Sequence, residues 1–398
     1  MVDETGISQE SLAAALQKGE LAFYYQPKVS LVTGRMSGGE ALLRWIRSDG
    51  RVIMPNAFLP MAEESGFITT ISRTMFPKLV EDMFIINGID AGLVTSFNLS
   101  ACDFADQRMV DLIDEAIRFE QLNAANLQVE LTEASVINED NLMLRRSLKA
   151  LTGMGVKLAM DDYGTGYSSI DSLSKWPFST VKIDQGLIRR MVESERSTTI
   201  VQASIRMAHQ LKMDIVAEGV ETSESYDFLL HSGCTEAQGF WIGRPMPLDE
   251  YLAFIRRDQR WSGLPTGLIH MAILDHVQWR QALIAQVTQI AFNGNSDAAI
   301  CASRAELDSH RCKLGQWYYG AGREFADNEL YRALERPHER LHRLGAKLLE
   351  AAQAGAARAD LVEKMRLLTH ESAMLLELLQ ELENEALLKG GDVLYQVT

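Results

Sequence analysis

Two patterns of apolar positions divide the chain. Up to about residue 258, short apolar runs alternate with longer stretches in which apolar and polar residues mix. From Leu268 onward leucine, alanine, glutamate and arginine dominate, and runs of the strand type are no longer found. Short bounded apolar runs are typical of buried strands, whereas apolar positions spaced by three or four residues are typical of helices. The sequence therefore predicts an α/β part followed by an all-helical part.

The first part is expected to contain eight strands. Most intervals between them, such as 138–154 and 193–212, are long enough for a helix. Eight strand–helix units in roughly 250 residues predict a (β/α)8 barrel, the TIM-barrel fold. An open, doubly wound sheet gives a similar alternation, so the pattern alone settles only the α/β class. The predicted strands cover residues 23–31, 39–45, 94–100, 127–132, 157–161, 180–184, 214–218 and 237–242.

A polar segment separates the two parts. Residues 256–267 are rich in arginine and contain glycine and proline, a composition typical of a linker. The expected domains are an α/β barrel over 1–258, a linker over 259–267 and a helical bundle over 268–398. Most histidines lie beyond the linker, which indicates a local use for this residue type. These histidines are His270, His276, His310, His338, His342 and His370.

Composition narrows the class of protein. The 398 residues are 46% hydrophobic and 23% charged, which is ordinary for a globular protein and excludes a mainly disordered chain. No run of about 18 apolar residues occurs, so no membrane insertion is expected. The acidic first residues lack the apolar core of a secretory signal, and the four cysteines contain no CxxC pair. A cytoplasmic location is therefore expected.

The net charge constrains the ligand. The chain carries 39 basic and 54 acidic residues, which give a formal charge of −15. This balance argues against a protein that holds duplex nucleic acid through many phosphate contacts. An anionic ligand would need another source of attraction, and metal ions are the obvious candidates.

Polar side chains lie at or near the ends of most predicted strands. In a barrel these ends converge on one face, where active sites are built. Five or more carboxylates meeting there would cost several kcal/mol per ion unless cations compensate. Oxygen ligands favour Mg²⁺ or Mn²⁺, and an aspartate bridging two such ions about 3.5–4 Å apart is a common design for phosphodiester cleavage. The polar residues are Glu40, Asn98, Glu130, Glu133, Asp161, Asp162, Lys182, Asp184, Glu218, Glu221 and Gln238.

These residues stand in an ordered set of motifs that resembles the EAL family, phosphodiesterases of cyclic di-GMP. Glu40-Ala41-Leu42 matches the tripeptide that names the family, and the resemblance covers roughly residues 8–257. One departure is Tyr163, where the family usually carries phenylalanine. The other motifs are Tyr25-Gln26-Pro27, Asn98-Leu99-Ser100, Glu130-Leu131-Thr132-Glu133, Asp161-Asp162-Tyr163-Gly164-Thr165-Gly166, Val181-Lys182-Ile183-Asp184, Ala217-Glu218-Gly219-Val220-Glu221 and Gln238-Gly239-Phe240.

The resemblance implies a modified barrel of the EAL type, in which the first strand is antiparallel. It also implies two bound ions, Mg²⁺ or Mn²⁺, which would activate a water for attack on phosphorus and open cyclic di-GMP to the linear dinucleotide pGpG. The implied ligands of the first ion are Glu40, Asn98, Glu130 and Asp161, and those of the second are Asp161, Asp162 and Glu218.

The resemblance gives the remaining motif residues roles around these ions. Lys182 would hold the water or a phosphate oxygen. Glu218 would act as a general base or only as a metal ligand, and both roles stay open. The other implied roles are orientation of the metal ligands (Glu221, Asp184, Gln238), bracing of the loop 162–169 (Glu133) and contact with the substrate (Gln26, Arg44).

Some members of the family bind the nucleotide without cutting it. They typically lack a metal ligand, whereas every ligand position is filled in this chain. Hydrolysis is therefore expected. The alternative is a catalytically silent receptor for cyclic di-GMP, or a zinc-sensing scaffold, that signals through a partner.

The helical part carries a second metal signal. His338 and His342 are four positions apart, so both imidazoles lie on one helix face. Pro337 suits the first turn of that helix. With His276 and Cys312 they form a set of three imidazoles and one thiol, which suits tetrahedral Zn²⁺.

The same residues resemble the chemoreceptor zinc-binding (CZB) family. Its hallmarks are a histidine before a tryptophan, a Cys-x-Leu-Gly-x-Trp segment and a late Pro-His-x-x-x-His, here at 276–279, 312–317 and 337–342. The resemblance implies one Zn²⁺ in a helical bundle that often forms a homodimer, a final helix over 359–388, and a chemoreceptor or other signalling complex as a partner. Since a fully ligated zinc leaves no place for substrate, zinc occupancy or oxidation of Cys312 is expected to regulate the phosphodiesterase.

Overall fold

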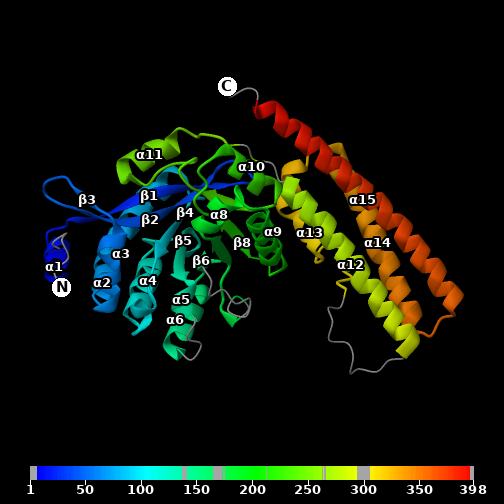
Figure 1. Ribbon diagram of the computed structural model, residues 1–398. Coiled ribbons are helices and arrows are strands. Elements are labelled where there is room, and N and C mark those ends of the chain that lie inside the picture. The colour runs from blue at the N-terminus through cyan, green and yellow to red at the C-terminus, as the bar shows by residue number, and fades with distance from the viewer. Residues whose placement is uncertain are drawn as a thin grey trace. The chain divides into compact units, whose positions relative to one another are not determined.

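The computed structural model describes residues 7–136, 141–164, 173, 175–211, 213–261, 263, 266–293 and 305–394. The chain divides into two compact units, Met1–Trp261 and Ser262–Thr398. The first unit mixes strands and helices, and the second is helical (Figure 1). Each unit is described separately below.

The first unit is a closed barrel. Its strands pair in the order β1, β2, β4, β5, β6, β7, β8, β9, and β9 pairs back with β1. Strand β1 is antiparallel to both neighbours, whereas the pairs from β2–β4 to β8–β9 are parallel. Closure excludes the open sheet and confirms the predicted barrel with its antiparallel first strand. The strands are β1 (Leu21–Ser30), β2 (Met36–Ile46), β4 (Val94–Asn98), β5 (Leu127–Thr132), β6 (Lys157–Tyr163), β7 (Thr180–Ile183), β8 (Asp214–Ala217) and β9 (Glu236–Gln238), with short β3 (Val52–Ile53) and β10 (Met246–Pro247) added outside the closed ring.

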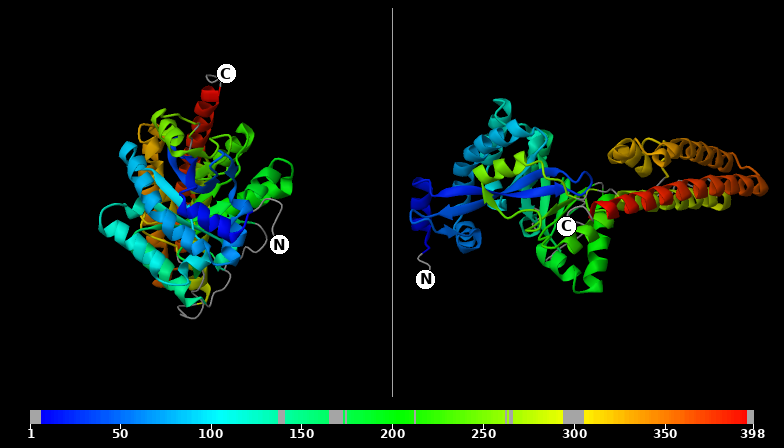
Figure 2. Two further views of the ribbon diagram at one scale, coloured as in Figure 1. Left: turned by 90° about the vertical axis from the view of Figure 1, so that its left-hand side faces the viewer. Right: turned by 90° about the horizontal axis from the view of Figure 1, so that it is seen from above.

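Helices cover the outside of the barrel, as the ribbon views show for α3, α4 and α6 (Figures 1 and 2). Side-chain caps explain where several of them begin: Ser194 caps α9 and Thr222 caps α10 by accepting a backbone N–H three residues on. The helices are α1 (Gln9–Gln17), α2 (Leu59–Glu64), α3 (Ile68–Ile89), α4 (Arg108–Arg118), α5 (Glu133–Val136), α6 (Leu142–Gly153), α8 (Gln185–Met191), α9 (Glu195–Gln210), α10 (Ser223–His231) and α11 (Leu248–Arg256).

The barrel strands are buried on both faces, as their continuous apolar runs predict. In β5, Leu127, Val129 and Leu131 are fully buried, and Val181 and Ile183 are fully buried in β7. Strand β9 ends at Gln238, four residues before the predicted end. The physical reason is a turn: the amide N–H groups of Ile242 and Gly243 both donate to the Gly239 carbonyl, so these residues cannot continue the ladder.

The second unit is a bundle in which long helices pack side by side (Figures 1 and 2). Its helices are α12 (Thr266–Asn293), α13 (Lys313–Tyr319), α14 (Glu329–Gln353) and α15 (Arg358–Leu394). Leucines from α12, α14 and α15 form the core, since Leu283, Leu341, Leu348, Leu375 and Leu379 are fully buried. No helix in the described part of the chain is long and apolar enough to cross a membrane.

One prediction about this unit is wrong. Pro337 lies inside α14 and not in the first turn of a helix. The helix begins earlier because Asn328 caps it, its side chain accepting the backbone N–H groups of Leu330 and Tyr331. Proline removes one backbone donor, which the other bonds and the packing of a 25-residue helix can tolerate.

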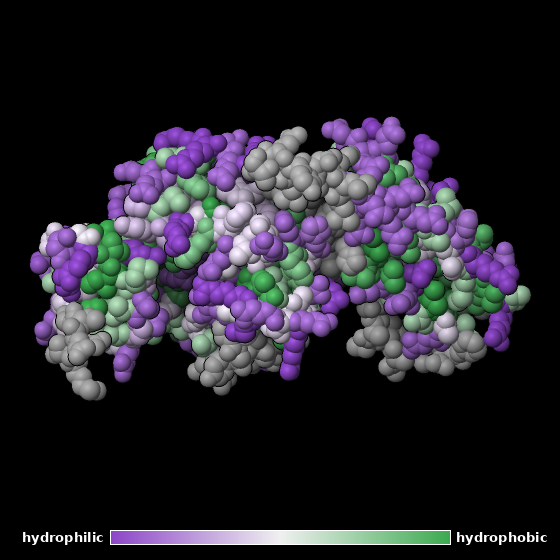
Figure 3. Space-filling view, turned by 45° about the horizontal axis from the view of Figure 1, so that its top comes forward, coloured by the Kyte–Doolittle hydropathy of each residue, from purple (hydrophilic) through white to green (hydrophobic). Residues whose placement is uncertain are grey.

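The face of the molecule drawn in Figure 3 is mainly hydrophilic. Hydrophilic residues cover most of the face drawn in Figure 3, and apolar residues show there as separate patches. The chain carries a formal charge of −15. On such a surface, an exposed apolar patch beside acidic groups is a candidate interaction site.

Candidate functional site

A buried ammonium lies at the centre of the barrel mouth. Lys182 in β7 is fully buried, and its Nζ lies 2.5 Å from Glu130, 2.6 Å from Glu218, 3.2 Å from Asp161 and 3.3 Å from Glu40. Glu40, Glu130 and Asp161 lie in three different strands and Glu218 directly follows a fourth, so the barrel brings them together from distant parts of the chain. One ammonium group therefore faces four carboxyl groups.

Strand register places Asn98, Glu130 and Asp161 near one end of the barrel. Asn98 lies opposite Glu130, and Asp161 lies opposite Thr132, so these three side chains approach the same mouth. Consecutive residues of a regular strand point to opposite faces. A register shift between Met160 and Tyr163 breaks that alternation, and Asp162 adopts a left-handed φ of 58°. The bulge allows two consecutive aspartates to serve one site.

Hydrogen bonds fix the carboxylate of Glu40. Asn98 Nδ2 donates to its Oε1 at 2.7 Å, and Gln238 Nε2 donates to its Oε2 at 2.7 Å. Gln238 Nε2 also lies 3.2 Å from Gln26 Oε1, and Gln26 Nε2 donates to the Gly243 carbonyl at 3.2 Å. The antiparallel register, with Gln26 opposite Glu40, brings these groups together. Gln238 thus holds the Glu40 carboxylate in one orientation.

The carboxylates differ in their affinity for protons. Burial would raise the pKa of Glu40, but the Lys182 charge and the bonds from Gln238 and Asn98 outweigh it and lower that pKa to about 2. Burial and the Glu40 charge raise the pKa of Glu130 to about 7. Burial also raises the pKa of Glu218 well above its usual range. Burial would lower the pKa of Lys182, but the surrounding carboxylates raise it. The raised pKa values of Glu130 and Glu218 indicate that one lysine does not offset four ionised carboxylates in this pocket.

The same residues suit divalent cations. Carboxylate oxygens of Asp161, Asp162 and Glu218 lie within 4.8 Å of one another. Glu130 Oε1 is buried and has no hydrogen-bond partner among the described residues. A buried carboxylate oxygen without a donor is costly unless a cation meets it. The all-oxygen donor set fits hard ions such as Mg²⁺ or Mn²⁺.

A cavity of about 200 Å³ opens beside these carboxylates. Glu40, Asp161, Glu218 and Gln238 line it, together with Arg189 of α8. Arg189 is the one basic residue among the lining side chains, and its Nη2 lies 2.5 Å from Glu221 Oε1. The sequence reading did not identify Arg189, although its place one helix turn beyond the strand that carries Lys182 was a usable signal.

Other predicted residues lie at the margin of the site. Asp184 caps α8, its Oδ1 accepting the Gly186 N–H at 2.9 Å. Glu133 is buried at the start of α5, and most of the loop that it is expected to brace lies outside the described residues. The Arg44 guanidinium lies 5.7 Å over the Tyr24 ring and donates to the Leu43 carbonyl.

A polar network inside the barrel was missed. Lys28 in β1 is buried and donates to Ser96 Oγ at 2.5 Å and to Gln128 Oε1 at 3.0 Å. Gln128 Nε2 in turn donates to Thr180 Oγ1 at 3.0 Å. Because these residues lie inside or next to predicted strands and form no motif, the pattern of apolar runs gave no signal for them. The network places a second ammonium inside the same barrel.

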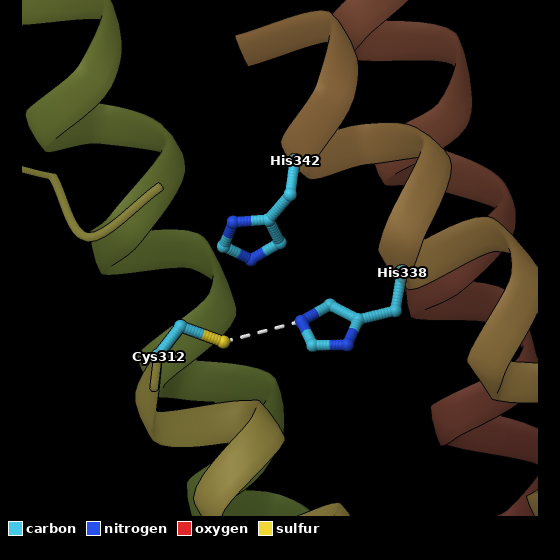
Figure 4. A group of neighbouring side chains, drawn as sticks. All are labelled: Cys312, His338 and His342. Carbon is cyan, nitrogen blue, oxygen red and sulfur yellow. Dashed lines mark hydrogen bonds between the residues drawn. The ribbon is translucent and has the colours of Figure 1, made fainter. Parts of the chain in front are cut away.

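A second cluster lies in the helical unit. Ligand atoms of Cys312, His338 and His342 lie within 4.8 Å of one another, and all three side chains are buried. Both imidazoles project from α14 toward the Cys312 thiol (Figure 4), and His338 Nε2 lies 3.2 Å from Cys312 Sγ. His342 Nδ1 lies 3.1 Å from the Leu307 carbonyl, a contact that fixes the ring.

His276 is buried but is not in this group of three. Its Nε2 lies 2.9 Å from Ser372 Oγ of α15, and its ring stacks on Trp279, which contacts the His342 ring. Burial lowers the pKa of His276 to about 4 and of His338 to about 3, so these imidazoles are neutral. Burial raises the pKa of the Cys312 thiol to about 11. Neutral imidazoles beside a thiol form a donor set that fits Zn²⁺.

Comparison with known proteins agrees with this geometry. The family model described as the EAL domain matches residues 9–245, and the model described as the chemoreceptor zinc-binding domain matches residues 276–349. The bifunctional diguanylate cyclase/cyclic di-GMP phosphodiesterase MucR of Pseudomonas aeruginosa is 38% identical over 245 residues, which is 61% of this chain and 36% of MucR. The cyclic di-GMP phosphodiesterase PdeR of Escherichia coli is 31% identical over 247 residues, 62% of this chain and 37% of PdeR.

The solved structures show the same fold. The structure described as the PaMucR phosphodiesterase in complex with c-di-GMP superposes with a TM-score of 0.57 at 37% identity and covers 61% of this chain and 98% of that one. The chain thus spans about a third of the length of these curated relatives. The likeness to them lies in the barrel.

Proposed function

Because the chain belongs to the EAL family, we propose that its barrel is a metal-dependent phosphodiesterase that hydrolyses cyclic di-GMP to linear pGpG. The relatives named as cyclic di-GMP phosphodiesterases support this reaction for the barrel. The observation that carries the proposal is the Lys182 ammonium, buried and surrounded by four carboxylates at the barrel mouth.

Glu40, Asn98, Glu130 and Asp161 would hold one divalent ion, and Asp161, Asp162 and Glu218 would hold a second. When bound, such ions lower the pKa of a water and stabilise the negative charge that grows on a phosphate in the transition state. The chain's own task is to keep these oxygens in place. Asn98 and Gln238 do so for Glu40 through the bonds described above.

Lys182 supplies a fixed positive charge that cannot leave. Its carboxylate neighbours keep it protonated. It would hold the attacking water or a phosphate oxygen once bound metal ions engage the carboxylates that surround it in this structure. Gln26 and Gln238 line the cavity and offer amides to the substrate, and Arg189 offers a guanidinium at the rim. These groups bind and orient an anionic dinucleotide in a pocket that is otherwise acidic.

The test is chromatography of the product after incubation of the full chain with cyclic di-GMP and Mn²⁺ or Mg²⁺. The expected result is pGpG in the presence of metal and none with a chelator, with Glu40→Ala reducing turnover by at least about a thousandfold. Binding of cyclic di-GMP without pGpG would support the receptor alternative. Absence of both would leave only the scaffold alternative.

The helical unit is proposed to bind one Zn²⁺ through Cys312, His338 and His342, with His276 as the fourth ligand. The match to a zinc-binding family model and the convergence of three donors support this assignment. His276 would have to exchange its Ser372 contact for the metal, or ligate through its other ring nitrogen. Zinc content of the purified chain and of a Cys312→Ala variant tests the site directly, and equal content would contradict it.

Zinc occupancy, or oxidation of Cys312, is proposed to change the phosphodiesterase rate. The support is the presence of both units in one chain. The measurement compares rates for zinc-loaded protein, zinc-free protein and Cys312→Ala at saturating Mn²⁺. Equal rates in all three would remove the regulatory role without affecting the barrel assignment.

A further inference from the structure

A second hollow of the first unit shares no residue with the candidate active site. It is a groove of about 660 Å³ between α3 and α4, on the outer wall of the barrel. Phe76, Val80 and Ala116 form its floor and are buried. Phe84 of α3 and Phe119, which follows α4, stand at its sides with 72% of their surface exposed. Two phenylalanines left this exposed beside one groove are unusual for a surface.

The apolar stripes on both helices follow helical periodicity. Phe76, Val80 and Phe84 are spaced by four residues along α3. Leu112 and Ala116 of α4 are spaced by four residues, and Phe119, the C-cap of α4, follows three residues later. Such spacing places the side chains of each helix on one face. The α3 stripe spans about 12 Å, roughly two turns. The two stripes face a common hollow that is long enough to receive two turns of a third helix.

The rim of the groove is acidic. Glu81, Glu115 and Glu120 line it and are exposed, and none of them forms an ion pair within the part of the chain that the structure describes. No lysine or arginine is among the lining residues. Glu120 keeps its carboxylate there despite a left-handed φ of 57°, a conformation in which glycine is less strained. The groove therefore combines an apolar floor with uncompensated negative charge.

We propose that this groove binds an amphipathic helix of a partner protein, whose apolar face fills the hollow and whose basic residues meet the three carboxylates. This is the helix-in-groove mode of recognition, with charges that set orientation and exclude wrong partners. A second copy of the chain is a poor occupant. A two-fold contact through this face would place the three carboxylates against themselves in a molecule that already carries a formal charge of −15.

A synthetic helical peptide with leucines at positions i, i+3, i+4 and i+7 and flanking lysines is the probe. The control peptide has the same sequence with glutamate in place of every lysine. Binding to the full chain is measured by fluorescence anisotropy with Mn²⁺ present, so that the acidic barrel mouth is neutralised. We expect the lysine peptide to bind at least about tenfold more tightly than the glutamate peptide, and hydrogen exchange to slow in α3 and α4.

Paired variants locate the contact. Glu81→Lys with Glu115→Lys, and separately Phe84→Ser, should each weaken the lysine peptide at least about tenfold. Glu195→Lys and Val192→Ser, exposed positions on another part of the barrel, are the matched controls and should leave binding unchanged. The proposal is overturned if both peptides bind equally, if protection maps to another element, or if the free chain is a dimer that Phe119→Ser dissociates.

Discussion

Replacing Lys182 by methionine separates a structural from a catalytic role for the buried ammonium. Methionine keeps the length of the side chain and removes the charge. In the metal-free protein four carboxylates then lose the one cation that lies within 3.3 Å of them among the described residues. Removing one partner of a buried ion pair costs about 3–5 kcal/mol. For a unit of this size, each kcal/mol lowers Tm by about 2–4 °C, so a fall of roughly 6–20 °C is expected.

Bound Mn²⁺ should offset part of this loss of stability. Once the ammonium is gone, Mn²⁺ meets less repulsion and has more negative charge to neutralise. The rise of Tm on adding saturating Mn²⁺ should therefore be larger for Lys182→Met than for the wild type. Activity should be lost in both states, because a metal does not replace a donor to the phosphate.

The measurement is thermal unfolding followed by circular dichroism at pH 8, with chelator and with Mn²⁺. The transition of the helical unit is identified by its shift when zinc is removed, and the other transition is assigned to the barrel. Lys149→Met, on the exposed side of α6, is the control and should shift Tm by less than about 2 °C. A metal-induced rise that is no larger in Lys182→Met than in the wild type would refute the charge-balance reasoning, even if activity is lost.

Three further predictions follow from particular groups. Because burial raises the pKa of Glu130 to about 7, the folded metal-free protein keeps a proton that the unfolded chain releases near pH 4.5. The free energy of unfolding should therefore decrease as the pH is raised from 4.5 to 7. Urea unfolding with chelator tests this, and an increase over that range would contradict it. Arg189→Gln should raise KM for cyclic di-GMP about tenfold with little change in kcat, and an unchanged KM would exclude substrate contact. Cys312→Ala should lower the Tm of the zinc-loaded helical unit toward that of zinc-free protein, and an unchanged difference would exclude the thiol as a ligand.

Much of the barrel could be predicted because its strands are buried on both faces. The predicted run 127–132 coincides with β5, and the acidic residues that follow such runs converge as the topology requires. Two consecutive aspartates, Asp161 and Asp162, face one site because of a bulge and a left-handed backbone at Asp162. The pattern of side chains in the sequence does not indicate either feature. Lys28 lies inside the predicted strand 23–31. A single charged residue in such a run does not indicate that its side chain is buried with polar partners, which only the fold supplies.

The helical unit shows a different limit. The spacing of His338 and His342 indicated a shared face, and the structure brings both to Cys312. The same spacing said nothing about where the helix begins, so Pro337 was placed wrongly. His276 matches the family motif, but its ring nitrogen contacts Ser372 of α15. Packing against α15, and not local spacing, decides this partner. The groove between α3 and α4 depends on tertiary packing and left no motif. Homodimer formation and a chemoreceptor partner stay predictions.

The two metal clusters differ in softness, and this difference decides how zinc regulation must be tested. Carboxylates favour hard ions, whereas a thiol with imidazoles favours Zn²⁺. Zn²⁺ nevertheless binds most ligand sets more tightly than Mn²⁺, so excess zinc should also enter the barrel site and inhibit it. Inhibition at excess zinc should therefore persist in Cys312→Ala, whereas a change of rate at one equivalent of zinc should disappear. If the variant keeps the one-equivalent response, zinc acts at the barrel carboxylates and the helical unit has no part in that response.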